Sequence, residues 1–526
     1  MKLWSLPFWR AGVIFCVGLF FWALRCIFVS RKGAASLKAA VFLRNFEHCC
    51  SVSVAFRRMG AVVVCFCAFA SPAHSETIQQ ALASAFENNP KLLAEQARLR
   101  GTDEEVARAH AGWRPNVTVD GQVGSEKTNT RPGSVLDGRT NPYGYSVTVN
   151  QPLFRGFRTL NGVKQAKATV MAGRANLRLV EQSVLLDAAT AFMNVVREKA
   201  VLRLRTNNVA VLAKQLKATE DRFAVGEVTT TDVAQARARR SEAVSRLNLA
   251  QANLKTALAE YRRVIGHDPS RLGRPGSIRK YLPKNQERAV QTALDEHPSI
   301  GVALYQEQAA RHNVQTIMGE RLPEVNLEAQ YSQNFDTTIA TDEREVGSIT
   351  GRVRMPLYQG GEVYARIRQA KQIVLQRQAE LNQARLQVRS NAISAWGQLQ
   401  AARAQVEANN QAVRSNGVAL NGVREEEKVG QRTILDVLDA EQAYLDSQVA
   451  LVTAQRDAVV AEYNLLSTLG RLSVTQLPIS TVHYDPVENF VRVERKWRGG
   501  DINHLELDET RLFYADDVFS RRERTK

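Results

Sequence analysis

Residues 143–177 read YGYSVTVNQPLFRGFRTLNGVKQAKATVMAGRANL, and they join a strand pattern to a helix pattern. The first eight residues alternate between large apolar and small or polar side chains, which predicts a strand with one apolar face. No proline follows from Phe157 to about Phe223, a length that corresponds to a helix of roughly 100 Å at 1.5 Å per residue. Heptad a and d spacing, typical of a coiled coil, is followed by Val163, Ala166, Val170, Gly173, Leu177, Val180 and Val184.

The same plan recurs later in the chain at a constant offset. Residues 151–154 (QPLF) recur as residues 355–358 (MPLY), and the pair Val225-Gly226 recurs as Val429-Gly430. We therefore predict one duplicated unit, because self-similarity at a single long period differs from the many short periods of a solenoid. The predicted parts are a leader at 1–75, a first repeat at 76–270, a linker at 271–286, a second repeat at 287–472, and a C-terminal segment at 473–526.

Each repeat is expected to contain a divided helical segment, two strands and a long helical hairpin. Pro90 and Pro298 should divide the helical segments, because proline removes a helix donor and clashes with the preceding turn. Polar stretches between the strands, residues 129–142 and 334–347, should be exposed loops. The expected strands lie at about 116–125, 142–152, 324–333 and 348–356, and the hairpins at 157–266 and 361–470. The returning helices are rich in alanine, for example Ala234, Ala236, Ala238, Ala250 and Ala252.

The alternation in the four strands is compatible with two environments. A membrane barrel requires one apolar and one polar face, but a soluble sheet packed on helices shows the same pattern. Four strands cannot close a barrel, since about eight are needed to surround even a filled interior. Open strand edges in lipid would leave backbone groups without partners. If the strands lie in a membrane, several chains must therefore share one barrel.

The composition separates the first 75 residues from the rest. The 526-residue chain has a net charge of +17, which alone suggests nucleic acid as a partner, but without residues 1–75 the charge is +9. The aromatic fraction of 7% also disfavours stacking surfaces for single strands, so we expect no nucleic acid. All six cysteines precede residue 68, which excludes a disulfide framework in the later chain: Cys16, Cys26, Cys49, Cys50, Cys65 and Cys67.

Residues 57–76, RRMGAVVVCFCAFASPAHSE, are typical of an export signal. A basic start, a short apolar run and small residues before Glu76 predict a signal peptide at about 57–75, with a buried core helix as the alternative. An upstream apolar run, Ala11–Val29, is either a membrane anchor or the result of a start codon assigned too far upstream, and we favour the latter. No later run is expected to span a membrane as a helix.

Taken together, the chain resembles the TolC-type outer-membrane efflux proteins, the exit ducts of tripartite pumps and type I secretion systems. The resemblance covers about 76–472 and is most specific at the hairpin tips, residues 222–233 (RFAVGEVTTTDV) and 429–440 (VGQRTILDVLDA). It implies a mainly α fold with a membrane β-barrel, in which three chains form a twelve-stranded barrel that continues into an α-helical tunnel. It also implies an equatorial segment followed by a flexible tail after residue 472.

The resemblance further implies a location and partners. The barrel would lie in the outer membrane of a Gram-negative bacterium, with the helical tunnel in the periplasm. The partners would be two copies of the same chain, a periplasmic adaptor (membrane fusion) protein, and an inner-membrane pump or ATP-driven exporter. The duct would give passive exit to small toxic compounds, as in multidrug resistance, to secreted proteins, or to both.

Site residues follow from the same resemblance. Adaptor docking would use the hairpin tips, where this chain keeps the valine and glycine of the family's Val-Gly-Leu motif but not the leucine: Val225, Gly226, Val429 and Gly430. Asp436 and Asp439 would form acidic rings at the tunnel entrance, although Asp436 is equally suited to cap a helix. Arg432, with Thr231 and Asp232 on a neighbouring coiled coil, would form a gate latch. Glu427 stands where the family often has a tyrosine.

No pattern of catalytic residues is found. The eight histidines are scattered, and the metalloprotease, phosphate-loop and serine-hydrolase motifs are missing. The acidic run Asp103-Glu104-Glu105 is interpreted as a solvated helix face. We therefore predict no enzyme, no cofactor and no metal site. The alternative function is a periplasmic or surface coiled-coil protein with a structural or adhesive role and no transport.

Overall fold

The computed structural model describes residues 75–133, 137–273, 276, 278–481 and 484–500. The predicted leader, except for Ser75, lies outside the described residues. So does the end of the predicted tail, residues 501–526. The account below concerns the described residues alone.

Each repeat begins with two short helices that are separated at a proline. In the first repeat, α3 (Ile78–Asn88) is followed by α4 (Pro90–His110), and in the second, α7 (Gln286–Glu296) is followed by α8 (Pro298–Met318). Both prolines occupy the first helical position, where a missing N–H costs nothing and the fixed φ favours the helix. The predicted breaks at Pro90 and Pro298 are confirmed.

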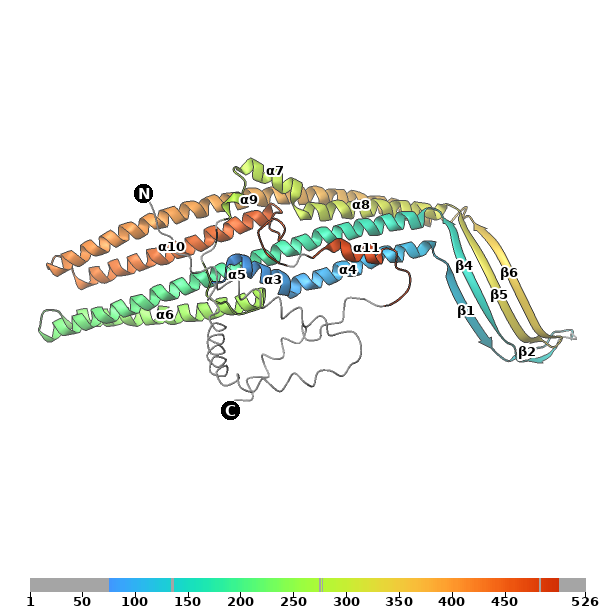
Figure 1. Cartoon of the computed structure of the whole chain (residues 1–526), viewed down its shortest axis with the longest axis horizontal. Coiled ribbons are helices and arrows are strands. Elements are labelled where there is room, and N and C mark those ends of the chain that lie inside the picture. Colours follow the sequence, from blue (N-terminus) through green and yellow to red (C-terminus); the bar gives the residue numbers. More distant parts are fainter. Residues whose placement is uncertain (1–74, 134–136, 274–275, 277, 482–483, 501–526) are drawn as a thin grey trace, which may run out of the picture. The chain divides into compact units, whose positions relative to one another are not determined.

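Two long helical hairpins dominate the fold (Figure 1). The first pairs α5 (Arg158–Ala224) with α6 (Thr230–Ile265), and the second pairs α9 (Glu362–Lys428) with α10 (Ile434–Thr468). Both α5 and α9 have 67 residues, so each extends roughly 100 Å. The heptad pattern of α5 marks its packed side, since the buried positions include Val163, Ala166, Val170, Leu177 and Val184.

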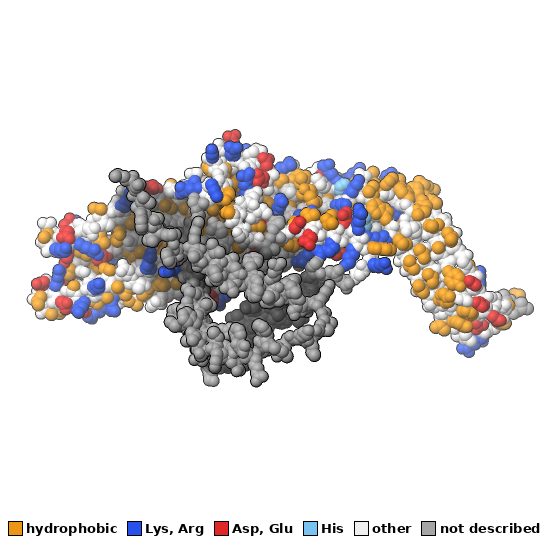
Figure 2. Space-filling model, viewed as in Figure 1, with side chains coloured by type: hydrophobic (Ala, Val, Ile, Leu, Met, Phe, Trp, Pro, Cys, Tyr) orange, Lys and Arg blue, Asp and Glu red, His pale blue; other side chains and the backbone are white. Residues whose placement is uncertain are grey.

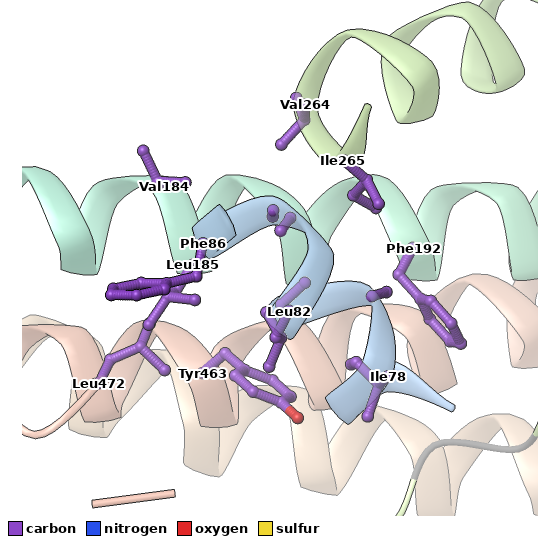
Figure 3. Close-up of a cluster of buried hydrophobic side chains, with 14 of the residues drawn as sticks. Ile78, Leu82, Phe86, Val184, Leu185, Phe192, Val264, Ile265, Tyr463 and Leu472 are labelled. Carbon is purple, nitrogen blue, oxygen red and sulfur yellow. The ribbon is translucent and has the colours of Figure 1, made fainter. Parts of the chain in front are cut away.

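The main core lies where both hairpins meet α3 and the segment after α10. Ile78 and Leu82 of α3 contact this core together with Phe192 of α5, Ile265 of α6 and Tyr463 of α10, all of them at most 1% exposed (Figure 3). Residues from both repeats therefore share one apolar cluster. Because this burial excludes water from side chains of four helices, it fixes the two hairpins relative to each other.

One described helix, α5, contains an 18-residue window that is long and apolar enough to cross a membrane, with a mean hydropathy of 1.3. The prediction that no apolar run long enough to span a membrane follows the leader is therefore wrong, because this window has the length and composition of a spanning helix. Half of that window is buried inside the protein, and α5 also supplies the fully buried Leu185 and Phe192 to the core. The apolar composition of α5 is explained by its place in this core.

The strands form a four-stranded antiparallel sheet in the order β1-β4-β5-β6. Its members are β1 (Asn116–Val123), β4 (Tyr143–Arg155), β5 (Glu324–Thr338) and β6 (Thr341–Arg354). The central pair, β4 and β5, joins the two repeats, with Val147 opposite Tyr331. Both β1 and β6 are edge strands, so the sheet has two open sides.

The prediction of a loop at residues 334–347 is wrong. β5 and β6 continue through most of it, and their ladder pairs Phe335 with Glu343 and Thr338 with Thr341. In the first repeat a second small ladder joins β2 (Glu126–Thr128) and β3 (Gly138–Thr140). Polar composition suggested loops, but side chains contact one another across these ladders. The rings of Tyr143 and Phe335 stack with their centroids 4.9 Å apart, and Gln333 donates to Glu343.

The apolar face of the sheet is not covered by any described helix. Val119 of β1 is 68% exposed and Ile349 of β6 is 78% exposed, and apolar side chains line the sheet surface in Figure 2. Other exposed apolar residues on these strands are Val117, Val123, Tyr143, Tyr145 and Val353. A soluble sheet packed on helices would bury these side chains, so that alternative is contradicted.

The passage from strand to long helix depends on a close backbone approach. Gly156 and Phe157 both have positive φ, 57° and 59°, immediately before α5 begins. A Cβ atom at Gly156 would lie 2.2 Å from the carbonyl oxygen of Gly319 at the end of α8. Only glycine fits at this position, where the helical part of one repeat contacts that of the other.

The segment after residue 472 includes a short helix, α11 (Pro486–Val493), which packs along α4, with Pro486 at its first position and Asp485 as its cap. The acidic run in α4 was expected to be solvated, and Glu104 is exposed. The expectation is wrong for Asp103, which is fully buried and accepts a 2.8 Å hydrogen bond from Asn489 of α11. Burial raises the pKa of Asp103, while the Asn489 hydrogen bond opposes the shift.

Candidate functional site at the two hairpin tips

The two hairpins turn through the same backbone motif. At the first tip, Gly226 has a φ of 80°, its N–H donates to the carbonyl of Phe223, and the N–H of Glu227 donates to the carbonyl of Arg222. At the second tip, Gly430 has a φ of 76°, and the N–H groups of Gly430 and Gln431 donate to Glu427 and Glu426 in the same way. These paired bonds form a Schellman motif, which ends a helix with a residue of positive φ.

The returning helices also begin alike. Thr229 and Thr433 are the N-caps of α6 and α10, and each accepts from the backbone N–H three residues later. Asp232 and Asp436 complete the two capping boxes, because each carboxylate accepts from the N–H and the hydroxyl of its threonine at 2.8–2.9 Å. These hydrogen bonds lower the pKa of both carboxyl groups. Both tips are thus stabilised by the same local interactions.

The predicted docking residues lie at the ends of the hairpins. Val225 is 72% exposed and Val429 is 70% exposed, although both are apolar. The adjacent Glu227 and Gln431 are exposed as well. Each tip therefore presents an exposed valine near a polar residue that stands where the family motif has leucine, and the first tip also exposes Phe223.

The two predicted ring residues lie on one helix but have different partners. Asp436 accepts only from neutral Thr433 groups, as a helix cap does, and forms no ion pair within 4.0 Å among the described residues. Asp439 is paired with Arg239 of α6 at 2.5 Å. The Asp439 side chain is 57% exposed, whereas Asp436 is half-buried. The acidic residues of the second tip are therefore not equivalent.

The predicted latch residues are not brought together within one chain. Arg432 pairs with Glu426 at 2.9 Å, and this partner raises the pKa of Arg432. Asp232 is engaged by Thr229, and Thr231 is an exposed residue of the first turn of α6. Within the described chain Arg432 and Asp232 thus have separate partners, and the link between them on neighbouring coiled coils stays a prediction.

Several residues that join the hairpins were missed by sequence reasoning. Arg222 of α5 binds Glu427 of α9 at 2.6 Å, and Asp446 of α10 faces Arg205 and Arg246 of the first hairpin at 3.6 and 3.9 Å. These partners are about 200 residues apart in the chain, so no local spacing relates them. The one available signal was the departure from the family at Glu427. The described residues contain no group of three or more His, Cys, Asp or Glu suited to a metal ion.

The family model of outer membrane efflux proteins matches residues 81–267 and 289–471, which are most of the two repeats. The chain belongs to this family. The outer membrane efflux protein BepC of Brucella suis is 41% identical over 427 residues, covering 81% of this chain and 92% of BepC. The outer membrane protein TolC of Salmonella enteritidis is 25% identical, covering 78% of this chain and 85% of TolC.

Solved structures agree on the fold. The outer membrane channel CmeC of Campylobacter jejuni superimposes with a TM-score of 0.67 at 15% identity, covering 80% of this chain and 89% of that one. This outer membrane efflux protein thus has the helical and strand architecture that the sequence predicts. The family also places it in the outer membrane of a Gram-negative bacterium, with the helices extending into the periplasm.

Proposed function

We propose that three copies of this efflux protein form one duct for passive exit across the outer membrane. The observation that carries the proposal is the uncovered sheet, in which both edge strands and the apolar side chains of β1 and β6 lack a partner among the described residues. Unpaired edges in lipid cost several kcal/mol per polar group. Three four-stranded sheets joined edge to edge satisfy these groups and give a twelve-stranded barrel, wider than the eight strands that side chains can fill.

The helices support the same assembly. α5 follows β4 directly, and each long helix extends roughly 100 Å from the sheet. On α6, Ala236, Ala243 and Ala250 are buried against the same chain, whereas Ala234 and Ala238 are exposed. Small exposed side chains let a helix approach a second neighbour closely. Helices of adjacent copies are proposed to pack on this face and to complete the periplasmic tunnel.

The hairpin tips are proposed to meet the partners of the duct. Val225 and Val429, with the turn glycines Gly226 and Gly430, would contact a periplasmic adaptor protein. An inner-membrane pump or ATP-driven exporter would supply the energy, because the chain shows no catalytic constellation of its own and is proposed not to be an enzyme. The cargo would be small toxic compounds, secreted proteins, or both.

The gate is proposed to lie between copies at the same tips. Arg432 is half-exposed and can exchange Glu426 for Asp232 and Thr231 of a neighbouring copy. The lowered pKa of Asp232 keeps its carboxylate ionised at neutral pH, as a charge-assisted link requires. Asp436 and Asp439 would face the entrance, since both lie on the first two turns of α10.

The test uses the full chain expressed with its own leader in a Gram-negative host. The outer membrane fraction is extracted in mild detergent, run unheated and boiled on a denaturing gel, and reconstituted in planar bilayers. We expect an oligomer in the unheated lane, a monomer in the boiled lane and discrete channel steps. A monomer that stays in the periplasmic fraction and produces no steps would contradict the duct and favour the structural or adhesive alternative.

A further inference from the structure

One ion pair at the hairpin tips changes what the acidic residues there can do. The guanidinium of Arg239, on α6, lies 2.5 Å from a carboxylate oxygen of Asp439, on α10. These residues belong to different hairpins and different repeats, 200 positions apart. Asp439 therefore has a cationic partner in direct contact. Asp436, one turn nearer the tip, accepts from Thr433, forms no ion pair within 4.0 Å among the described residues, and is influenced by the charge of Arg432 only at longer range.

Packing beside the pair holds the two helices together. Leu438, next to Asp439, is 2% exposed and lies in an apolar cluster with Ala243 of α6 and Leu212 of α5. Ala243 is one helical turn from Arg239, so this cluster fixes the register in which the two charged side chains meet. A second carboxylate near Arg239, that of Glu242, lies 3.7 Å away, but Arg246 binds it more closely, at 2.5 Å. Arg239 is thus available mainly to Asp439.

The neighbouring arginine on α6 has a different role. Arg237 lies two residues before Arg239, a rotation of about 200° around the helix, and it pairs with Glu220 of α5 at 3.0 Å. Arg237 therefore links α6 to α5 within the first hairpin, whereas Arg239 links α6 to α10 of the second hairpin. The chain offers a matched pair of arginines on one helix, of which only one meets α10.

We propose that Arg239 is a selectivity-determining residue, because it neutralises Asp439 by direct contact and leaves Asp436, which has no contact ion pair among the described residues, as the acidic ring that acts most strongly at the entrance. This proposal rests on the trimeric duct proposed above. Beyond the screening length of about 8–10 Å a close ion pair acts on a passing ion as a neutral group. A trimer then presents at its entrance three carboxylates without a contact ion pair, instead of the six that two unpaired rings supply.

The decisive experiment measures the potassium-to-chloride permeability ratio of single channels from reversal potentials in a salt gradient. Arg239→Gln frees Asp439, and an added unit charge some 6 Å from an ion in water changes its local concentration about threefold. We expect the ratio of Arg239→Gln to rise about threefold or more over the native channel. Asp439→Asn leaves Arg239 unpaired, and we expect its ratio to fall. Arg237→Gln and Arg239→Lys should keep the native ratio.

The opposite signs separate charge from structure. Both Arg239→Gln and Asp439→Asn break the same link between hairpins, so a merely structural role would shift selectivity the same way in both or leave it unchanged. Either of these results, or an equal shift in Arg237→Gln, overturns the proposal while the duct stands. Channel steps and a heat-sensitive oligomer in the native protein distinguish this failure from failure of the duct itself. If Arg239→Gln does not assemble, the fall in permeability ratio expected for Asp439→Asn tests the proposal by itself.

Discussion

The two hairpin tips have the same backbone and different charges. Each ends its long helix with a glycine of positive φ, Gly226 or Gly430, and starts its return helix with a capping box. The side chains around this shared turn differ, because Arg222 of the first tip has Glu426 as its counterpart in the second, and Val228 has Arg432. The two repeats therefore share the residues that form the turn and differ in the side chains around it.

This contrast shows which residues carry structure and which carry function. Turn glycines and capping threonines act on their own backbone, so both repeats need them. Charged residues at the second tip, such as Arg432 and Asp439, pair with side chains of other helices, α9 and α6, and their roles between copies are proposed. Substituting a turn glycine or a capping threonine should destabilise either tip by the same amount. Substituting Arg432 or Asp439 should affect the second tip alone.

The largest effect is expected at the proposed latch. Arg432→Ser removes the cation of the latch and should raise the single-channel conductance several-fold, and Asp232→Ala should do the same. Asp232→Asn keeps an oxygen for the Thr229 cap and so separates loss of charge from loss of the cap. Native conductance in both Arg432→Ser and Asp232→Ala would remove these residues from the gate.

The turn glycines should show equal and smaller effects. Gly226→Ala and Gly430→Ala meet no atom within 4 Å, so their cost is that of a positive φ, about 1 kcal/mol each. Amide exchange measured by mass spectrometry should become about fivefold faster in each tip. Gly422→Ala, inside α9 with open space around it, is the control and should not accelerate exchange. A large difference between the two tips would show that their turns are not equivalent.

A weaker interaction ties the two tips of one chain together. Arg222 and Glu427 form a part-exposed ion pair, so a double-mutant cycle with Arg222→Gln and Glu427→Gln should give a coupling of at most about 1 kcal/mol. Amide exchange measured at both tips should show this coupling. The exposed pair Lys428–Glu425 lies within α9 alone and should show almost no coupling. Zero coupling for Arg222 and Glu427 would mean that the tips move independently.

The smallest effect concerns pH. The pKa values of Asp232 and Asp436 are lowered by their capping hydrogen bonds, so the folded tips favour the ionised carboxylates. This stabilisation is fully present above the ordinary value of 3.8 and is lost as the pH falls through the lowered values. Pepsin should therefore cleave both tips faster at pH 2.5 than at pH 4.5, after correction with an unstructured substrate. Asp232→Asn and Asp436→Asn should each remove the change at their own tip.

Sequence reasoning predicted the features that depend on local patterns. The breaks at Pro90 and Pro298, the lengths of the two long helices and the glycine turns all follow from residues close in the chain. Residues 334–347 were missed as strand because the contacts that order them come from distant segments, as when Tyr143 stacks on Phe335, and leave no local alternation.

Contacts between distant segments could not be predicted in this way. Asp103 looked solvated because its partner Asn489 is 386 residues away, and Asp439 looked like a free carboxylate because Arg239 is on the other hairpin. The resemblance named Asp436 and Asp439 together, but only packing between repeats shows that one of them is paired. Roles in docking and gating stay predictions.

The most direct test of the shared barrel joins the two open edges of the sheet. Thr118→Cys on β1 is combined in turn with Ser348→Cys, Thr350→Cys or Arg352→Cys on β6, in a chain that has no cysteine after Cys67. The cells are oxidised, and outer membranes are boiled and run without reductant. The duct predicts covalent dimers and trimers, and nothing larger, for at least one of the three pairs. Monomers alone in all three, or a ladder that continues beyond three chains, would contradict it.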